Sequence, residues 1–478
     1  MTSAFLLELS AEEAIRRIAR GELHAEEYAS HLLARYREVK SLNAVTWIDD
    51  ARVLEEARTI DRRRAKGERP GPLAGLPVIV KDNIDVAGTP SAAATLTLRD
   101  NFAKTSAPIV RRLFNCGAIF FAKANMHELA GGGTSTNPSF GAVRNPYDLK
   151  RVPGGSSGGT AAALAAHMVP AGLGSDTAGS VRIPSALSGT AALRPTILPQ
   201  KLYADAGVVP LALDLDTIGP MARTIADVAL LHAAITATPI PTVLNLRGLR
   251  IGVPRRPYWE DLEPEVERVM TQALEKLRVA GVVFVDIDTE SYNPLASEVY
   301  RTLVMHGIKN DLAPYLAGIS QRVTIEQVVA GIASKDTKTL FESARDLDIS
   351  AAEIHQARTA SRQRIGSAYQ ELFREHQLAA IMFPTVPMVA PFIREGGDLR
   401  NDEIEINGRM RNKNLMLLRN THVTGALGVP GISLPAGLSK QGLPVGLELD
   451  GLTGRDSELL SLGIAVENVL GPLPPPAL

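Results

Sequence analysis

The chain has 478 residues, of which 51 are basic and 52 are acidic, so its net charge is −1. This balance provides no overall positive field for nucleic acid or for an anionic membrane surface, and no hydrophobic run is long enough to span a membrane. Cys116 is the single cysteine, which excludes internal disulfides and zinc sites built from several cysteines. We therefore expect a globular cytoplasmic protein, large enough for one big domain or for two or three ordinary ones.

The first 70 residues show the periodicity of helices. Ser10 and Glu13 have the spacing of a capping box, the reciprocal pair of hydrogen bonds that opens a helix. Tyr28, Leu32 and Tyr36 recur every four residues, which places them on one helix face. The pattern predicts helices over residues 10–19, 25–39 and 50–66 and a strand over 43–48. We interpret residues 1–70 as an outer helical layer in which no catalytic chemistry is visible.

A fully apolar run from Val78 to Val80 is followed directly by a lysine, Lys81. The run predicts a buried strand with the lysine at its end. From this segment alone the lysine is an ordinary surface cation, because its long side chain can reach past the edge of a sheet. If apolar strand ends bury it instead, its charged form is disfavoured and its pKa falls toward the range of a general base.

A strand–helix alternation continues after this lysine. Residues 106–115 predict a helix, with Pro108 in its first turn and Gly117 just beyond its end. Residues 118–122 predict the next strand, and such alternation is typical of α/β folds. Cys116 lies at the end of the helix, where we expect it to be a buried packing residue.

Two glycine-flanked serine sites lie between residues 151 and 184. Ser156 and Ser157 stand between two pairs of glycines, and Ser180 directly follows Gly179. Glycine permits backbone conformations that other residues avoid, so both sites are predicted to be tight turns. Successive N–H groups in such turns can converge on an anion, as an oxyanion hole requires.

A helix and a strand are predicted between the two serine sites. The alanine-rich run over residues 160–168 predicts the helix, with Thr160 as its N-cap and Pro170 beyond its end. Residues 171–175 predict a short buried strand. Two other interpretations of this region are a flexible linker and a phosphate-binding loop. The apolar surroundings disfavour the linker, and the Gly-Lys-Ser/Thr ending of a P-loop is missing.

The second half of the chain alternates in a similar way. A strand–helix–strand unit is predicted from residue 250 to 285, and residues 293–376 are polar and helical. Buried strands are predicted within residues 379–387, 428–435 and 443–449. Together with the first half, these elements predict an α/β fold.

The serine motifs resemble those of the amidase signature family of serine hydrolases. The hallmark of that family is Gly-Gly-Ser-Ser-Gly-Gly followed by a Gly-Ser-Asp-Thr-Gly-Gly-Ser-like strand and turn, which this chain matches between residues 154 and 180. The resemblance implies that Ser180 is the nucleophile, Ser156 the bridging serine on a cis peptide, and Lys81 the terminal base. All three occur in the family's order and spacing, although Ala178 stands where the family usually has glycine.

The resemblance also implies the surroundings of the catalytic residues. The oxyanion would be held by the backbone N–H groups of Thr177, Ala178, Gly179 and Ser180. The loop that contacts the substrate carbonyl region would contain Ala130, Gly131 and Gly132. His127 precedes this loop, but the family uses no histidine as a base, so we assign it a structural or pocket-rim role. A relay of this kind needs neither a metal ion nor an organic cofactor.

Over most of the chain the resemblance implies one domain, residues 1–478, with a large mixed central sheet flanked by helices on both faces. The match weakens between residues 290 and 378, which we interpret as a variable helical cap region within that domain. A shorter departure covers residues 197–203, where the common Gly-Arg turn of the family is missing.

The function implied is hydrolysis of a small carboxylic amide of the aryl, arylacetic or anilide type, through a Ser-cisSer-Lys relay and an acyl-enzyme. A carbamate hydrolase (urethanase) shares the same core, and motifs do not separate the two. Further alternatives are the amidase subunit of a tRNA-dependent amidotransferase and an inactive scaffold, although the intact Lys81, Ser156 and Ser180 disfavour the scaffold. The expected partner is a small-molecule amide or carbamate, without nucleic acid or membrane, and a homodimer is left open.

Overall fold

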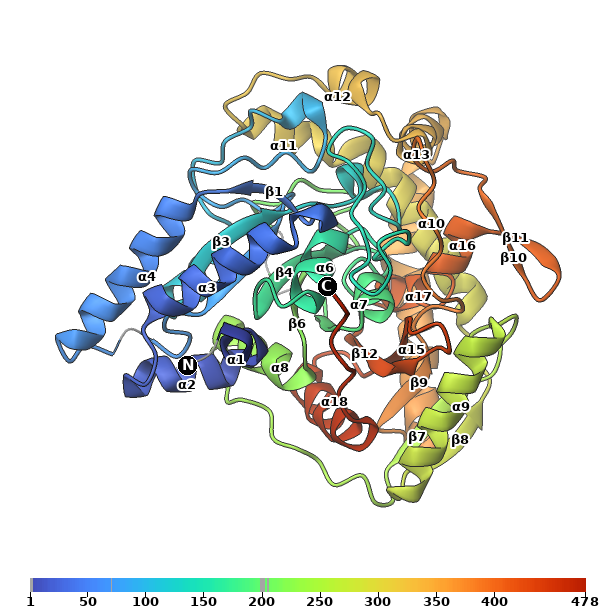
Figure 1. Cartoon of the computed structure of the whole chain (residues 1–478). Helices are drawn as coiled ribbons and strands as arrows, with labels where there is room; N and C mark the ends of the chain where they lie inside the picture. Colours follow the sequence, from blue (N-terminus) through green and yellow to red (C-terminus); the bar gives the residue numbers. More distant parts are fainter. Residues whose placement is uncertain (1–2, 70, 198–202, 204–205) are drawn as a thin grey trace.

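A large mixed β-sheet forms the centre of the molecule (Figure 1). The computed structural model describes residues 3–69, 71–197, 203 and 206–478. Most of the segment 197–203, where the sequence departs from the pattern of the amidase signature family, therefore lies outside the described residues. Within the described part, the sheet has 11 strands. In spatial order they are β1 (Val45–Ile48), β3 (Ile119–Ala124), β2 (Pro77–Lys81), β4 (Ala171–Asp176), β6 (Thr217–Ala222), β5 (Ala191–Arg194), β12 (Gly431–Leu438), β13 (Pro444–Asp450), β9 (Ala380–Pro384), β7 (Arg250–Pro254) and β8 (Val283–Ile287).

Parallel and antiparallel strand pairs occur in different parts of this sheet. β2 runs parallel to β3 and β4, and β7 runs parallel to β8 and β9. The strands between these two parallel groups pair antiparallel, from β4–β6 through to β13–β9. The predicted α/β fold with a large mixed central sheet is therefore confirmed.

Burial on both faces explains why the central strands are apolar without alternation. In β2, Val78 and Val80 pack in one hydrophobic cluster, whereas Ile79 packs in another on the opposite face. β6 divides in the same way, since Met221 joins the cluster of Ile79 and Ile218 joins that of Val78. Successive strand side chains point to opposite faces, so a sheet covered on both sides needs apolar residues at consecutive positions.

Helices cover the two faces of the sheet. On one face lie α5 (Pro108–Asn115), α8 (Ile225–Thr236), α9 (Pro264–Val279) and α18 (Asp456–Leu470). On the other lie α6 (Gly158–Ala165) and α7 (Arg182–Ser188). The N-terminal helices, blue in Figure 1, share an apolar cluster with α6 and are α1 (Ser3–Glu8), α2 (Ala11–Arg20), α3 (Ala25–Glu38) and α4 (Asp50–Ala65).

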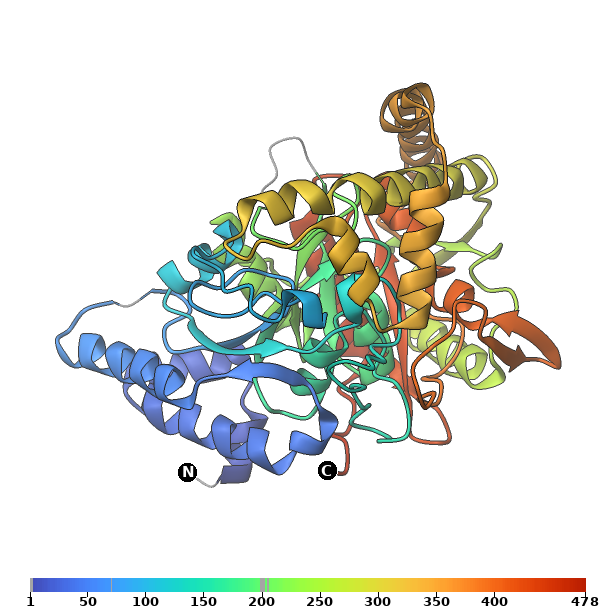
Figure 2. The ribbon, with the colours of Figure 1, turned by 90° about the horizontal axis from the view of Figure 1, so that it is seen from above.

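A further group of helices, gold to orange in Figure 2, lies along one side of the molecule. They are α10 (Asn293–Asn310), α11 (Leu312–Gly318), α12 (Ile325–Gly331), α13 (Lys335–Asp346), α14 (Ala351–Gln356) and α15 (Arg362–His376). A separate hairpin of β10 (Glu403–Ile406) and β11 (Arg409–Asn412) projects beside them and is followed by α16 (Lys413–Leu418) and α17 (His422–Leu427). No helix in the described ranges is both long and apolar enough to cross a bilayer.

Two predicted helix starts differ from the structure. Ser10 caps α2 by accepting from the N–H of Glu13, but the Glu13 carboxylate binds Arg16 and Arg17 and does not complete the capping box. Thr160 as an N-cap is wrong, because α6 begins at Gly158 with Ser157 at the N-cap position, and it ends at Ala165. The first turn of the helix contains the two glycines, and it lies close to the Ser135 and Pro153 side chains at Gly158 and to neighbouring backbone at Gly159.

Substitution of Gly159 tests this close approach. A Cβ at Gly159 would lie 2.2 Å from the carbonyl oxygen of Asn125 and 2.5 Å from that of Ala44. Because backbone atoms cannot easily move aside, Gly159→Ala is expected to lower the free energy of unfolding by about 1–3 kcal/mol or more. Gly366→Ala in α15, where a Cβ meets nothing within 4 Å, is the control and should be neutral or stabilising. Urea unfolding of both variants measures the difference, and equal stabilities would contradict the packing argument.

Candidate active site

Lys81 is the last residue of β2, and its side chain is fully buried. Its Nζ donates to Ser156 Oγ at 2.7 Å, to Ser175 Oγ at 2.9 Å and to the Ser175 carbonyl at 3.2 Å. Burial lowers the pKa of this lysine from 10.5 to about 7, although the charges of Asp176 and Asp216 act in the opposite direction. A substantial fraction of the lysine is therefore neutral at neutral pH, and a neutral amine can accept a proton.

Ser156 lies in the glycine-rich turn that leads into α6. The peptide bond between Gly155 and Ser156 is cis. The Ser156 carbonyl accepts from the N–H of His127 at 3.1 Å and from Ser135 Oγ at 3.3 Å, so the turn is tied to the loop that follows β3. These contacts hold the Ser156 hydroxyl beside Lys81.

Ser180 lies in the turn between β4 and α7. The left-handed residue of this turn is Gly179, with φ 129°, so Ala178 is accommodated where the family usually has glycine. The N–H of Ser157 donates to the Ser180 carbonyl at 3.1 Å, which joins the two serine turns directly. The structure therefore brings Lys81, Ser156 and the Ser180 turn together, as the order of the motifs predicts.

The carboxylate of Asp176 holds the turn that contains Ser180 in place. It accepts from the N–H groups of Gly179 at 2.8 Å and Val181 at 3.1 Å, and it forms buried ion pairs with Arg182 and Arg194. Burial acts to raise the pKa of Asp176, but the two guanidinium groups outweigh it and hold the pKa well below its usual range. The carboxylate stays charged and fixes the turn.

One expected oxyanion donor already has another partner. The N–H of Gly179 donates to Asp176 Oδ1 at 2.8 Å. Within the described part of the chain, no group accepts from the N–H groups of Thr177, Ala178 and Ser180. These three N–H groups are available for an anion beside Ser180.

A second carboxylate, that of the partly buried Asp216, holds the far side of this turn. Thr177 Oγ1 donates to Asp216 Oδ1 at 2.5 Å, and the N–H groups of Leu211 and Ala212 donate to Asp216 Oδ2 at 2.8 and 2.9 Å. Burial raises the pKa of Asp216 to about 6. The carboxylate thus connects the Ser180 turn to the loop that carries Leu211.

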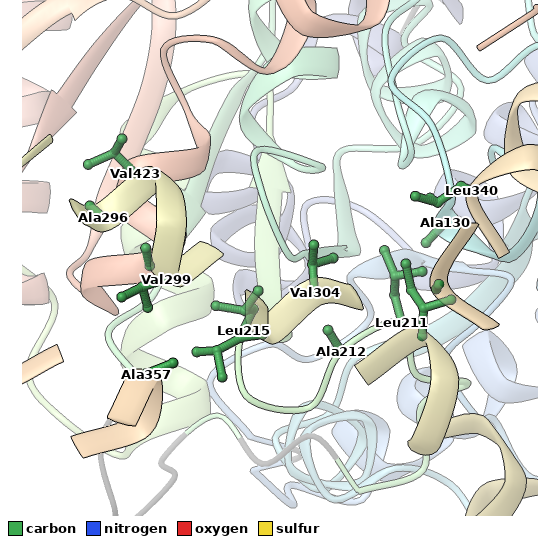
Figure 3. Close-up of a cluster of buried hydrophobic side chains, with 14 of the residues drawn as sticks. Ala130, Leu211, Ala212, Leu215, Ala296, Val299, Val304, Leu340, Ala357 and Val423 are labelled. Atoms are coloured by element: carbon green, nitrogen blue, oxygen red, sulfur yellow. The ribbon is translucent and has the colours of Figure 1, made fainter. Parts of the chain in front are cut away.

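A cavity of about 420 Å³ opens onto Ser180. Its apolar wall includes Ala130, Leu211, Val304, Met305, Leu340, Leu415 and Leu418. Figure 3 shows Ala130, Leu211 and Leu340 gathered at one end of the side chains drawn from a larger apolar cluster, to which α10 and the chain around residues 211–215 contribute. A cavity of this size and lining can bury an aromatic or aliphatic group while its amide lies at Ser180.

The three residues expected to contact the substrate all line this cavity. They are Ala130, Gly131 and Gly132. A Cβ at Gly131 would lie 2.7 Å from the Thr337 side chain, and one at Gly132 would lie 2.4 Å from the His127 ring. His127 is fully buried and lies 3.2 Å from Asp336 of α13, so it supports this loop from behind, consistent with a structural role.

Several polar residues of the cavity were missed by sequence reasoning. They are Ser297, Tyr300, Arg301, Arg400, Asn414, Arg419 and His422. They come from α10 and from the chain after β9, where no motif with fixed spacing signals a site. The described residues contain no group of three or more histidine, cysteine or acidic side chains arranged to hold a metal ion.

Comparisons with known proteins agree with this geometry. A family model described as Amidase matches residues 27–460. An indoleacetamide hydrolase from Agrobacterium vitis is 36% identical over 96% of this chain and 97% of its own, and a mandelamide hydrolase from Pseudomonas putida is 35% identical over 98% and 93%. A crystal structure of an amidase superposes with a TM-score of 0.85 at 29% identity, covering 97% of this chain and 100% of that one. The chain therefore belongs to the amidase signature family and is a hydrolase acting on carbon–nitrogen bonds.

Proposed function

We propose that this enzyme hydrolyses small carboxylic amides of the aryl, arylacetic or anilide type, with Ser180 as nucleophile and Ser156 and Lys81 as the proton relay. The observation that carries the proposal is the contact of 2.7 Å between the buried Lys81 Nζ and Ser156 Oγ. A serine hydroxyl is a weak nucleophile and needs a base. Burial lowers the pKa of Lys81 to about 7, which suits a base at neutral pH.

In the first half of the reaction, Ser180 Oγ attacks the carbonyl carbon of the amide. The Ser180 proton passes to Ser156 Oγ while the Ser156 proton passes to Lys81 Nζ. The carbonyl π electrons move to oxygen, and the N–H groups of Thr177, Ala178 and Ser180 stabilise the oxyanion. When the C–N bond breaks, the relay returns a proton to nitrogen and the amine leaves an acyl-enzyme on Ser180.

In the second half, water attacks the acyl group and gives its proton to the same relay. The oxyanion forms again in the same place and then collapses, breaking the bond to Ser180 Oγ. The proton returns to Ser180, and the carboxylic acid is released. Every proton has a donor and an acceptor among this chain, the substrate and the attacking water, so the cycle leaves Lys81, Ser156 and Ser180 as they began.

The aryl preference is supported by the cavity and by the relatives. The apolar residues around Leu211, Val304 and Leu340 offer a dry surface for a ring. Two relatives that match nearly the whole chain are named for indoleacetamide and mandelamide. A carbamate would meet the same serine and oxyanion donors, so a urethanase activity is the second outcome to be tested.

A hydrolysis panel tests the proposed function. Phenylacetamide, indoleacetamide, mandelamide, an anilide, an aliphatic amide and an aryl carbamate are incubated with the purified chain, and released amine or ammonia is measured. We expect kcat/KM to be highest for the aryl and arylacetic amides. Carbamates as the best substrates would assign a urethanase instead. No turnover of any small amide by the isolated chain would contradict the proposal and favour a partner-dependent amidotransferase subunit or a scaffold.

A further inference from the structure

The cavity that opens onto Ser180 has a strongly uneven charge. Three arginines line it, Arg301, Arg400 and Arg419, and no acidic side chain is among the described residues that do so. A cavity lined by one sign of charge attracts ligands of the opposite sign. The apolar residues of the cavity can hold an aromatic ring, but they do not explain why three arginines line the same cavity.

Arg419 is occupied by the protein itself. Its three guanidinium nitrogens donate to Asn420 Oδ1 at 3.0 Å and to the carbonyls of Glu260 at 2.7 Å and Tyr258 at 3.2 Å. The role of Arg419 is therefore to fix neighbouring backbone. Arg400 and Arg301 differ, because no acceptor within the described ranges pairs with either guanidinium group. Arg301 is exposed at the cavity, whereas Arg400 is half-buried.

The acids nearest to Arg400 in sequence are bound by other cations. Asp398 is paired with Lys413, and Asp402 is paired with Lys413 at 3.0 Å and with Arg394 at 2.8 Å. Lys413 is almost fully buried, so these pairs form a fixed support beneath the loop. The positive charge of Arg400 is left without a partner even though two carboxylates flank it in the chain.

The backbone of Arg400 is also fixed. Its carbonyl accepts from the side-chain amides of Asn412 at 3.2 Å and Asn414 at 3.4 Å. The preceding N–H, that of Leu399, donates to Asp402 Oδ2 at 2.8 Å. A cation on a braced loop binds a ligand with little loss of chain entropy, since the ordering is already present.

Asn414 adds an unpaired acceptor to the same cavity wall, and this acceptor requires a donor, not the anionic group itself. The residue lines the cavity and is 5% exposed, yet its Oδ1 is buried without a hydrogen-bond partner among the described residues. An unpaired buried acceptor is costly, and a ligand or water that offers an O–H or N–H relieves that cost. The unpaired acceptor lies beside Arg400, because the Asn414 amide nitrogen contacts the Arg400 carbonyl.

We propose that the preferred substrates are amides that carry an anionic group, such as a carboxylate, and that Arg400 binds this group while the amide lies at Ser180. The inference rests on the proposed amidase function and narrows its substrate class. Arg301, which is exposed and lines the same cavity, adds to the attraction. A guanidinium group pairs well with a carboxylate through two parallel hydrogen bonds.

The test compares matched substrates that differ by one carboxylate group on the ring. Phenylacetamide is the neutral substrate, and its 3- and 4-carboxylates, 3- and 4-(carbamoylmethyl)benzoate, are the anionic ones. In wild type we expect a higher kcat/KM for at least one anionic isomer, with a KM that rises with ionic strength, whereas the KM of phenylacetamide does not. This measurement needs no variant and so does not depend on the folding of one.

Variants then assign the preference to Arg400. Arg400→Gln is expected to lower kcat/KM for the anionic substrate about 10- to 100-fold, mainly through KM, while phenylacetamide changes little. Arg400→Lys should restore part of the preference, because the charge returns without the planar fork. Arg409→Gln is the matched control: it removes an exposed charge from the same segment outside the cavity and should affect neither substrate.

The outcomes separate this inference from the proposed function. Equal kcat/KM values for neutral and anionic substrates in wild type would overturn the anionic class while leaving the amidase function intact. Equal losses for both substrates in Arg400→Gln would also overturn it, since they indicate that Arg400 supports the loop or stacks on the ring. If the wild-type enzyme hydrolyses neither phenylacetamide nor its carboxylates, the result would contradict the proposed amidase function, and the inference about Arg400 would fall with it.

Discussion

Ser180→Ala is expected to reduce amide turnover by about 10⁴-fold or more. The substitution removes the oxygen on which the acyl-enzyme forms, so the relay has nothing to activate. The side chain is 8% exposed at the cavity, and alanine keeps its Cβ, so the free energy of unfolding should change little. Steady-state kinetics on phenylacetamide, with thermal unfolding of the same preparation, measures both effects.

A neighbouring serine provides the control for this variant. Ser157 is also buried in the glycine-rich turn, and its hydroxyl donates to the Ser175 carbonyl at 3.3 Å. Ser157→Ala removes the same atom type from the adjoining turn without touching the proposed relay, so it should retain far more activity than Ser180→Ala. Wild-type turnover in Ser180→Ala, with a contaminating hydrolase excluded, would contradict the assignment of the nucleophile.

Substitution of Lys81 is expected to cost several orders of magnitude in kcat/KM. Lys81→Ala leaves Ser156 with no acceptor for its proton. Lys81→Arg keeps a positive charge at the site, but a guanidinium group stays protonated at any working pH and cannot act as a base. Both variants should therefore be nearly inactive in amide hydrolysis. Near-wild-type activity in Lys81→Arg would show that the site needs only a cation and would refute the base role.

The pH dependence of the wild-type enzyme tests the same role from another side. Burial lowers the pKa of Lys81 to about 7, and the neutral form is the active one, so kcat/KM should fall as pH drops below about 7 and level off above it. Since the pH dependence of kcat/KM reports the free enzyme, the fall in kcat/KM at low pH should have the same midpoint for different amides. A flat profile between pH 5 and 9, or activity that rises toward low pH, would be inconsistent with a neutral lysine.

Much of the fold and of the catalytic centre could be predicted because their signals are local. The apolar run Val78–Val80 predicts a strand buried on both faces, and the structure places β2 between β3 and β4. That position explains why Lys81 at its end is buried, which the sequence alone left open. The two serine motifs are contiguous, so the turns of Ser156 and Ser180 could be anticipated. Their catalytic roles stay predictions until the variants are measured.

The details that sequence reasoning missed depend on tertiary packing. Thr160 has the side chain of a good N-cap, but α6 begins two residues earlier, at glycines that lie close to neighbouring parts of the chain. Gly179 has the conformation of an oxyanion turn, yet its N–H is bound by Asp176, three residues earlier. Neither fact has a signature in the local pattern.

The substrate-facing residues were the least predictable part of the site. Tyr300 of α10 is far in the chain from Arg400 and Asn414, which follow β9, and the three residues meet at the cavity only in the folded structure. A lone arginine in a polar loop resembles any solvated cation in sequence. Only the structure shows that Arg400 is unpaired among the described residues, because Asp398 and Asp402 on either side of it are bound to another cation.

Covalent catalysis by Ser180 is the central step of the proposed mechanism. Wild type and Ser180→Ala are mixed with an activated ester of phenylacetic acid, quenched in acid within milliseconds to seconds, and examined by intact mass and peptide mapping. We expect one phenylacetyl group per wild-type chain, attached to Ser180, and none in the variant. An acyl group on Ser156 or on another residue, or turnover of the wild type with no acyl group at any quench time, would contradict this mechanism.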